Sequence, residues 1–180
     1  ITLKLENREI QSERLLVAAG AWSHQLASQQ GGKIPLETER GYHVTLNSKE
    51  GGPQNIVMEA AHKFMATPME MGVRFAGTAE FAGLKTPANQ TRAEILLKLG
   101  KKMYPQLENE ESSDWMGHRP SLPDSRPVID FCPGSRKIIF AFGHGHRGLI
   151  GAPMTARLVA ELASGKKPTI DISAFNSTRF

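Results

Sequence analysis

The segment Gly143-His144-Gly145-His146-Arg147-Gly148 has the residue types in this sequence that most favour ligand binding. Three of its six residues are glycine, and it lies between an apolar run and a stretch with helical spacing. Glycine lets the backbone approach a ligand, and a loop that leads into a helix places N–H groups at the positive end of the helix dipole. The segment therefore predicts a site for an anionic or electron-rich group, although a tight strand-to-helix turn has the same composition.

Arg119 and Tyr42 are two further residues with useful chemistry. Arg119 stands in the run GHRP, where rigid neighbours would fix a guanidinium that holds a carboxylate through two parallel hydrogen bonds. From the residues alone, a solvated arginine at the end of a strand is the more ordinary interpretation. Tyr42 either lines a substrate cavity or packs within a sheet, and packing is the simpler interpretation.

The remaining reactive residue types form no recognisable site. The six histidines lack the HxxxH spacing of a zinc site, so we expect no bound metal. Ser23 and Ser121 lack a GxSxG context, and Cys132, the single cysteine, has no base arranged beside it in the sequence. We therefore expect no nucleophilic catalysis and interpret Cys132 as a core thiol.

Apolar runs and turn residues predict the elements that must position these side chains. The run Leu15–Ala19 predicts a buried strand, followed by a turn at Gly20 and a short helix over Gln25–Gln30. Further stretches separated by turn residues predict an antiparallel sheet with strands at Tyr42–Leu46, Ile56–Glu59, His62–Thr67 and Val73–Ala76.

The second half of the chain continues this pattern. Apolar residues three or four positions apart predict an amphipathic helix over Arg92–Tyr104 that covers the sheet. A strand runs through Trp115 toward Arg119, and the prolines after it predict an extended, turn-rich path. Lys137–Phe142 predicts another strand, and Ile150–Ala163 predicts the last helix.

These elements predict an α+β fold in three pieces. The pieces are a strand-turn-helix unit over residues 1–30, a sheet-and-helix unit over 31–113, and a strand-loop-helix unit over 114–180. A chain of 180 residues, of which 39% are hydrophobic, is long enough to enclose a core of ordinary size.

Charge and composition exclude several classes of protein. The formal net charge is +4, but the basic residues are interleaved with acidic ones and form no stripe, so we expect no nucleic-acid partner. The longest apolar runs are far shorter than the ~20 residues of a membrane-spanning helix, and the first ten residues do not resemble a signal peptide. A lone cysteine fits a reducing compartment. We predict a cytoplasmic protein, either free or peripheral to the inner face of the membrane.

Three blocks of the sequence, taken in order, resemble the FAD-dependent oxidoreductases that include D-amino-acid dehydrogenase, glycine oxidase and sarcosine oxidase. Residues 16–23, LVAAGAWS, resemble the family's V-x-A-x-G-x-W-S strand and turn. Residues 117–129, GHRPSLPDSRPVI, resemble its G-x-R-P-x-x-P-D-x-x-P-x-I segment. Residues 142–149, FGHGHRGL, resemble its G-H-G-x-x-G loop, so the similarity covers nearly the whole chain.

The resemblance implies an FAD cofactor and a substrate that is a D-amino acid or a related amine. The C–N bond would be oxidised to an imine by hydride transfer to FAD, and the imine would hydrolyse to a keto acid and ammonia. Arg119 falls on the arginine that holds the substrate carboxylate, and no other catalytic side chain is implied. Tyr42 and Phe64 are the expected cavity-lining residues. The residues expected to contact FAD are Ala19, Gly20, Trp22, Gly143, His144, Gly145, His146, Arg147, Gly148, Leu149 and Ile150.

By the same resemblance, residues 1–30 and 114–180 belong to an FAD-binding α/β domain and residues 31–113 form the substrate-binding domain. The family's N-terminal βαβ segment, whose G-x-G-x-x-G turn cradles the FAD pyrophosphate, has no counterpart here. We therefore expect this chain to be inactive alone.

Three alternatives stay open at this point. The chain could be a non-catalytic substrate-binding module, or a subunit that completes a flavin site with a partner chain supplying the nucleotide-binding half. It could also be the amine-oxidoreductase module of a tRNA-modifying enzyme. The resemblance favours a dehydrogenase over an oxidase, with a quinone or oxygen as the electron acceptor.

Overall fold

The computed structural model describes residues 1–48 and 50–180, which form two compact units. Unit 1 contains residues 1–38 and 119–180, and unit 2 contains residues 39–118. Strands β4 (Glu37–Leu46) and β8 (Ser112–Ser121) carry the chain from one unit to the other.

Unit 1 is built on a three-stranded sheet with the order β3-β10-β9. Strand β3 (Leu15–Val17) runs parallel to the central strand β10 (Ser135–Phe142), and β9 (Val128–Cys132) runs antiparallel to it. A separate hairpin of β1 (Thr2–Lys4) and β2 (Glu9–Gln11) precedes this sheet.

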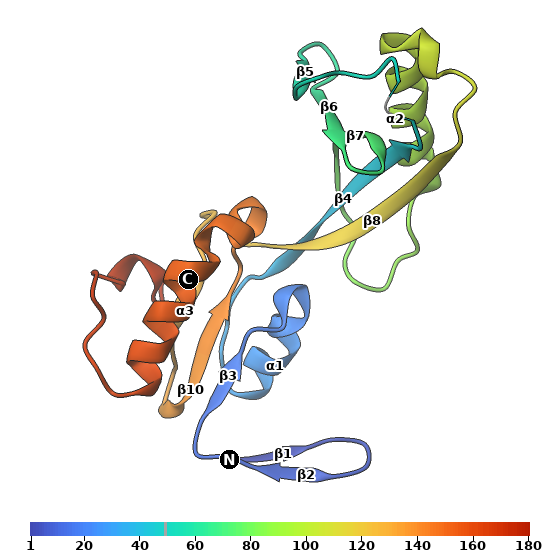
Figure 1. The fold of residues 1–180 in the computed structure, drawn as a ribbon. Helices are drawn as coiled ribbons and strands as arrows, with labels where there is room; N and C mark the ends of the chain where they lie inside the picture. Colours follow the sequence, from blue (N-terminus) through green and yellow to red (C-terminus); the bar gives the residue numbers. More distant parts are fainter. Residues whose placement is uncertain (49) are drawn as a thin grey trace. The chain divides into compact units, whose positions relative to one another are not determined.

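Helices cover both faces of the unit 1 sheet. Figure 1 shows β10 between helix α1 (Ser23–Gln29) and helix α3 (Gly148–Ala163). Successive side chains of a strand point to opposite faces, so alternate residues of β10 enter two separate hydrophobic clusters. Phe140 packs in the cluster that includes Ala27 of α1, and Ile139 packs in the cluster that includes Leu158 of α3. Each such burial stabilises the unit by about 1.5–3 kcal/mol.

Unit 2 is an antiparallel sheet with the strand order β5-β6-β7-β4-β8. The strands not yet defined are β5 (Val57–Glu59), β6 (Phe64–Met69) and β7 (Gly72–Phe81). A β-bulge between Tyr42 and His43 shifts the register of β4 against β7. The predicted antiparallel sheet is therefore confirmed.

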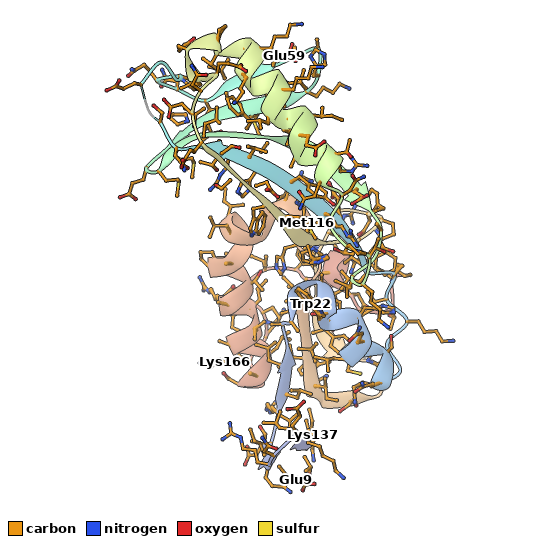
Figure 2. The ribbon with its side chains drawn as sticks, turned by 90° about the vertical axis from the view of Figure 1, so that its right-hand side faces the viewer. Glu9, Trp22, Glu59, Met116, Lys137 and Lys166 are labelled. Atoms are coloured by element: carbon orange, nitrogen blue, oxygen red, sulfur yellow. The ribbon has the colours of Figure 1, made fainter. Side chains whose placement is uncertain are left out.

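Helix α2 (Gln90–Met103) lies along one face of this sheet, as Figure 2 shows. Its buried residues include Ala93 and Leu96, which join the hydrophobic cluster formed by that face. A short 3-10 helix, η2 (Pro105–Leu107), follows and buries Leu107 in the same cluster. The predicted helix over 92–104 is confirmed and begins two residues earlier than expected.

Several predicted elements differ from the structure. Strand β3 ends at Val17, not at Ala19, because the last two residues of the apolar run lead into the 3-10 helix η1 (Gly20–Trp22) and do not continue the strand. Strands β2 and β9 were not predicted, since each is short and lacks a clear apolar alternation. Strand β8 continues through Pro120, which is tolerated because β8 is an edge strand.

The C-terminal tail contains one further 3-10 helix, η4 (Ser173–Phe175), and is anchored by hydrogen bonds. The side chain of Arg179 donates from Nε to Asp124 Oδ2 at 2.7 Å and from Nη2 to Asp124 Oδ1 at 3.1 Å. The backbone N–H and the hydroxyl of Ser177 both donate to Asp130 Oδ2. The tail is therefore held against β9 and the segment before it.

Candidate functional site

Two glycine turns lie at the same edge of the unit 1 sheet. Strands β3 and β10 run parallel with Val17 opposite Phe140, and each ends in a turn that leads into a helix. Gly20 and Gly143 stand in these turns with φ of 56° and 84°, in the left-handed region that favours glycine. In open α/β sheets, ligands bind beyond the carboxyl ends of parallel strands. The structure thus brings together the two segments expected to contact the cofactor.

The first segment is Ala19 with the 3-10 helix η1. Ala21 is buried, whereas Ala19 is exposed and the indole of Trp22 is 51% exposed. Figure 2 shows Trp22 at the start of helix α1. An exposed tryptophan beside a glycine turn offers a flat apolar surface to a ligand.

Gly143 begins the second segment and packs tightly against its neighbours. A Cβ atom at this position would overlap the side chain of Leu122, which is itself buried. Leu122 follows directly after strand β8, so the loop and the end of β8 have fixed positions relative to each other. Any larger residue at Gly143 would have to displace Leu122 or the loop, and it would be strained at a φ of 84°.

His144 attaches the loop to helix α3. Its Nε2 lies 2.9 Å from Oγ1 of Thr155, within hydrogen-bond distance. Ideal Cβ atoms at Gly148 and Gly151 would lie 3.5 and 3.7 Å from the His144 side chain, so small residues on one face of α3 make room for the imidazole. Burial lowers the pKa of His144 below its usual value, which favours the neutral ring.

The start of helix α3 is open to a ligand. The N-cap residues of α3 and of the preceding 3-10 helix η3 (Gly145–Arg147) make no side-chain capping hydrogen bond to the first N–H groups of these helices. Leu149 and Ile150 are 93% and 84% exposed. Uncapped N–H groups beside an exposed apolar pair fit a large ring with polar edges, as in a flavin. His146 and Arg147 are also exposed at this turn.

Arg119 lies near the end of β8 and is partly buried. It precedes Leu122 by three residues, and Ser121 Oγ lies 3.8 Å from an ideal Cβ at Gly145. The end of the strand that carries Arg119 therefore lies beside the loop that begins at Gly143. This arrangement is compatible with the expected carboxylate-binding role of Arg119.

Tyr42 and Phe64 lie elsewhere, in the buried cluster of unit 2. Phe64 is 2% exposed and packs edge-on against Phe75. Tyr42 donates a hydrogen bond of 2.5 Å to Glu80 Oε2 and accepts one from the backbone N–H of Asn89. The expectation that these two side chains line a cavity finds no support here, because both are on the face that α2 covers.

The Tyr42 hydrogen bond also affects the charge of its partner. It is the largest cause of a lowered pKa at Glu80, with the guanidinium groups of Arg92 and Arg40 adding to it. Arg40 is fully buried and donates to the backbone carbonyls of Ala82, Gly83, Thr86 and Pro87. This cluster fixes the loop between β7 and α2.

Cys132 is buried, as predicted for a core thiol, and burial raises its pKa. Within residues 1–48 and 50–180, no group of three or more histidine, cysteine, aspartate or glutamate side chains could hold a metal ion. No helix in the same described part of the chain is long and apolar enough to cross a membrane.

Sequence reasoning missed Leu122 and Thr155, which hold the Gly143 loop in place. Thr155 could have been found from its position, because Gly148, Gly151 and Thr155 recur at helical spacing and leave one face of α3 free of bulk. Leu122 has no such signal, because its partner Gly143 is distant in the sequence.

The fold and site define a class of protein: an α/β unit with two glycine turns at one sheet edge, joined to an antiparallel-sheet unit. The sequence matches the family model described as FAD dependent oxidoreductase, DAO, over residues 2–162. The chain belongs to this family, whose members use FAD.

Particular relatives support the assignment. The chain is 45% identical to a D-amino-acid oxidase of Bradyrhizobium diazoefficiens over 184 residues, covering 100% of this chain and 44% of the relative. It is 30% identical to a D-amino acid dehydrogenase of Paramagnetospirillum magneticum, covering 95% of this chain and 41% of that protein. The chain thus spans less than half the length of these relatives.

Solved structures show the same fold. Glycine oxidase from Geobacillus kaustophilus superposes with a TM-score of 0.87 at 24% identity, covering 99% of this chain and 49% of that one. L-amino acid deaminase from Proteus vulgaris superposes with a TM-score of 0.80 at 19% identity, covering 97% of this chain and 45% of that one.

Proposed function

We propose that this chain forms part of a flavin-dependent oxidoreductase that oxidises the C–N bond of a D-amino acid or a related amine. Its product would be an imine, which water converts to a keto acid and ammonia. Bound FAD would accept the α-hydrogen and two electrons from the substrate. The relatives named D-amino-acid oxidase and D-amino acid dehydrogenase support this choice of substrate.

The main support for this proposal is that two glycine turns lie at one edge of the unit 1 sheet. The turn at Gly20 and the loop at Gly143 follow parallel neighbouring strands, and the second leads into the uncapped N-terminus of α3. Helix N–H groups there would stabilise negative charge on a bound ring. Unit 1 would thus hold part of the cofactor, and unit 2 would be the substrate domain.

The residues of this chain would act by binding and orientation. Arg119 would pair with the substrate carboxylate and so fix the direction of the α-hydrogen. His144, neutral and held by Thr155, would keep the loop in place without adding a charge beside the cofactor. Trp22, Leu149 and Ile150 would contribute apolar contact and exclude water from the ring.

A second role has its own support: the chain would be a subunit that completes a flavin site with another polypeptide segment. In the described part of the chain, β3 pairs with β10 along one edge only, and Leu16 on this strand is 47% exposed. A parallel strand could extend the sheet at the other edge of β3. A separate chain would then supply the nucleotide-binding half.

Flavin titration tests the proposal. The 180-residue chain and the same chain joined to the part of the Bradyrhizobium relative that it does not cover would each be titrated with FAD. Visible absorbance would report binding, and anaerobic bleaching by a panel of D-amino acids, with L-amino acids as controls, would report oxidation. We expect bleaching by a D-amino acid in the joined protein. No flavin binding by either protein would refute the function.

Two variants of the joined protein separate the roles. Gly143→Val should abolish flavin binding, because the added side chain overlaps Leu122 and displaces the loop. Arg119→Gln should retain flavin binding and raise KM for the amino acid, since it removes a charge-assisted pair worth about 1.5–3 kcal/mol. An unchanged KM would remove Arg119 from substrate binding. Lys98→Gln, an exposed charge change on α2, is the control.

A further inference from the structure

A cavity of about 450 Å³ lies in unit 1 at the amino ends of the parallel strands β3 and β10. Phe131 and Leu162 give it an apolar floor, and both belong to the hydrophobic cluster that α3 forms with the sheet. The two glycine turns lie at the opposite, carboxyl ends of the same strands. Figure 2 shows Lys137, which lines the cavity, and Trp22, which follows a glycine turn, at these two ends. The cavity is therefore separate from the candidate cofactor site.

Three cationic side chains and one carboxylate line this cavity. The cations are Arg14, which directly precedes β3, and Arg136 and Lys137 near the start of β10, and the carboxylate is Glu13. The ion pairs found within residues 1–48 and 50–180 include none of these four side chains. Three cations less one carboxylate leave the cavity with a net charge of +2 at neutral pH.

Two of the cations come from neighbouring parallel strands. Leu15 of β3 is the register partner of Ile138 of β10, and Arg14 and Lys137 directly precede these two residues. Neighbouring strands lie about 4.8 Å apart, and like charges beside each other on two strands destabilise a sheet. An anion bound between the two side chains would remove this repulsion.

Arg136 and the end of α3 form the rest of the wall. The Cζ atom of Arg136 lies 4.4 Å from the centre of the Phe131 ring, and a guanidinium stacked on a ring keeps its N–H edge available for hydrogen bonds. Backbone N–H groups of Ser164, Gly165 and Lys166 donate to carbonyl oxygens of the last turn of α3. These bonds cap the negative end of the helix and so reduce its repulsion of an anion.

We propose that this cavity binds a small organic molecule that carries a phosphate group. The guanidinium groups of Arg14 and Arg136 donate to the phosphate oxygens, and Lys137 adds a third positive charge. A dianionic phosphate matches the net charge of +2, whereas a single carboxylate leaves half of it unpaired. The cavity has the size of a small-molecule site, and its apolar floor accepts the carbon part of the ligand. The site needs no flavin and goes beyond the proposed function.

Three probes test this site in the full chain without FAD, by isothermal titration calorimetry in low salt at about pH 8, where a phosphate monoester is a dianion. Phenyl phosphate has the expected charge and an apolar ring, phenyl sulfate has the same shape with one charge, and inorganic phosphate lacks the ring. We expect phenyl phosphate to bind about tenfold more tightly than either of the others. Amide chemical shifts would locate it, with the largest changes around Arg14 and Lys137.

Variants test the charges of the cavity separately. Arg14→Gln and Lys137→Gln should each weaken phenyl phosphate binding by about tenfold, and Arg14→Lys should lose less. Glu13→Gln should tighten binding by about two- to fivefold because it removes the one negative charge of the cavity, and an unfolded variant could not show such a gain. Arg8→Gln removes an exposed charge from another part of unit 1 and should leave the affinity unchanged.

Equal affinities for phenyl phosphate and phenyl sulfate, or an Arg14→Gln variant that binds phenyl phosphate like the parent, would overturn the proposal. Chemical shift changes confined to residues 143–148 would do the same, because they would place the phosphate at the start of α3. Binding to vesicles that contain phosphatidic acid, without binding of phenyl phosphate, would assign the cations to a membrane surface and refute the small-molecule site. The separate FAD titration tests the oxidoreductase function, so the two failures are distinguishable.

Discussion

Replacing Arg40 by methionine should destabilise unit 2 strongly and leave its exposed charged side chains unchanged. The Arg40 side chain is 0% exposed, and its three nitrogens donate at 2.6–3.0 Å to the carbonyl oxygens of Ala82, Gly83, Thr86 and Pro87. Methionine retains much of the aliphatic volume and provides no donor. All four carbonyl oxygens therefore lose their partner.

The expected size follows from where these oxygens are. A carbonyl left buried and unpaired costs about 1–3 kcal/mol, but residues 82–87 are partly or fully exposed and can turn toward water. We therefore expect a loss of about 3 kcal/mol rather than the sum over four groups. Arg40→Lys should lose about half as much, because an ammonium keeps the charge but has three donors on one atom.

Urea unfolding followed by Trp115 emission, in a Trp22→Phe background, would measure the change within unit 2. The midpoint should fall while the m value stays constant, because the same surface is exposed on unfolding. Hydrogen exchange should quicken most in the loop before α2. Arg8→Met, at an exposed position of unit 1, is the matched control. A loss below about 1 kcal/mol would show that Arg40 does not hold the loop.

Three further outcomes are expected from the cited contacts. Arg179→Gln and Asp124→Asn should each destabilise unit 1 by about 1 kcal/mol, and the double variant no further. Hydrogen bonds from Arg179 lower the pKa of Asp124, so this contribution should be complete above pH ~4 and lost as pH falls through the lowered value; a pH-independent effect in urea unfolding would contradict the pairing. His144 has a folded pKa lowered by burial, so the protonated ring favours the unfolded chain, and stability should fall as pH drops below ~6.5; a His144 NMR titration at or above that value would refute this. Cys132, buried and with a raised pKa, should react with iodoacetamide far more slowly in the native chain than in urea, and equal rates would contradict its burial.

The glycine turns of unit 1 could be predicted because their chemistry is local. A run of apolar residues that ends in glycine, followed by helical spacing, defines strand, turn and helix within about 30 residues in both copies of the pattern. The sequence could not show that Gly20 and Gly143 meet at one sheet edge, because that depends on the pairing of Val17 with Phe140 across more than a hundred residues. Nor do turn residues mark the divisions between the two units, since β4 and β8 run through both.

In the unit 2 sheet, the type of a residue predicts the face on which it lies less well than its place in the alternation along the strand. Tyr42 and Phe64 have side chains suited to a substrate cavity, yet both belong to the alternating set that enters the core beneath α2. The residues of opposite parity, His43 and Arg74, are the ones that face away from that core. Arg74 stands between the buried Val73 and Phe75 in the sequence, and this alternation alone assigns it to the face of the sheet opposite α2.

The same alternation explains why two arginines of one sheet have different surroundings. Arg40 shares the parity of the core residues of β4, so it survives burial only by occupying its donors with loop carbonyls, and its role is structural. Arg74 lies on the other face, and its Nε is shielded from solvent and has no hydrogen-bond partner among the described residues. Arg40 keeps this role only in the present register of β4, because a one-residue shift of register sends every side chain of a strand to the other face. An insertion of one residue between Gly41 and Tyr42 should therefore remove the loop anchor, because Arg40 would turn away from the core beneath α2 while Tyr42 and Val44 kept their places.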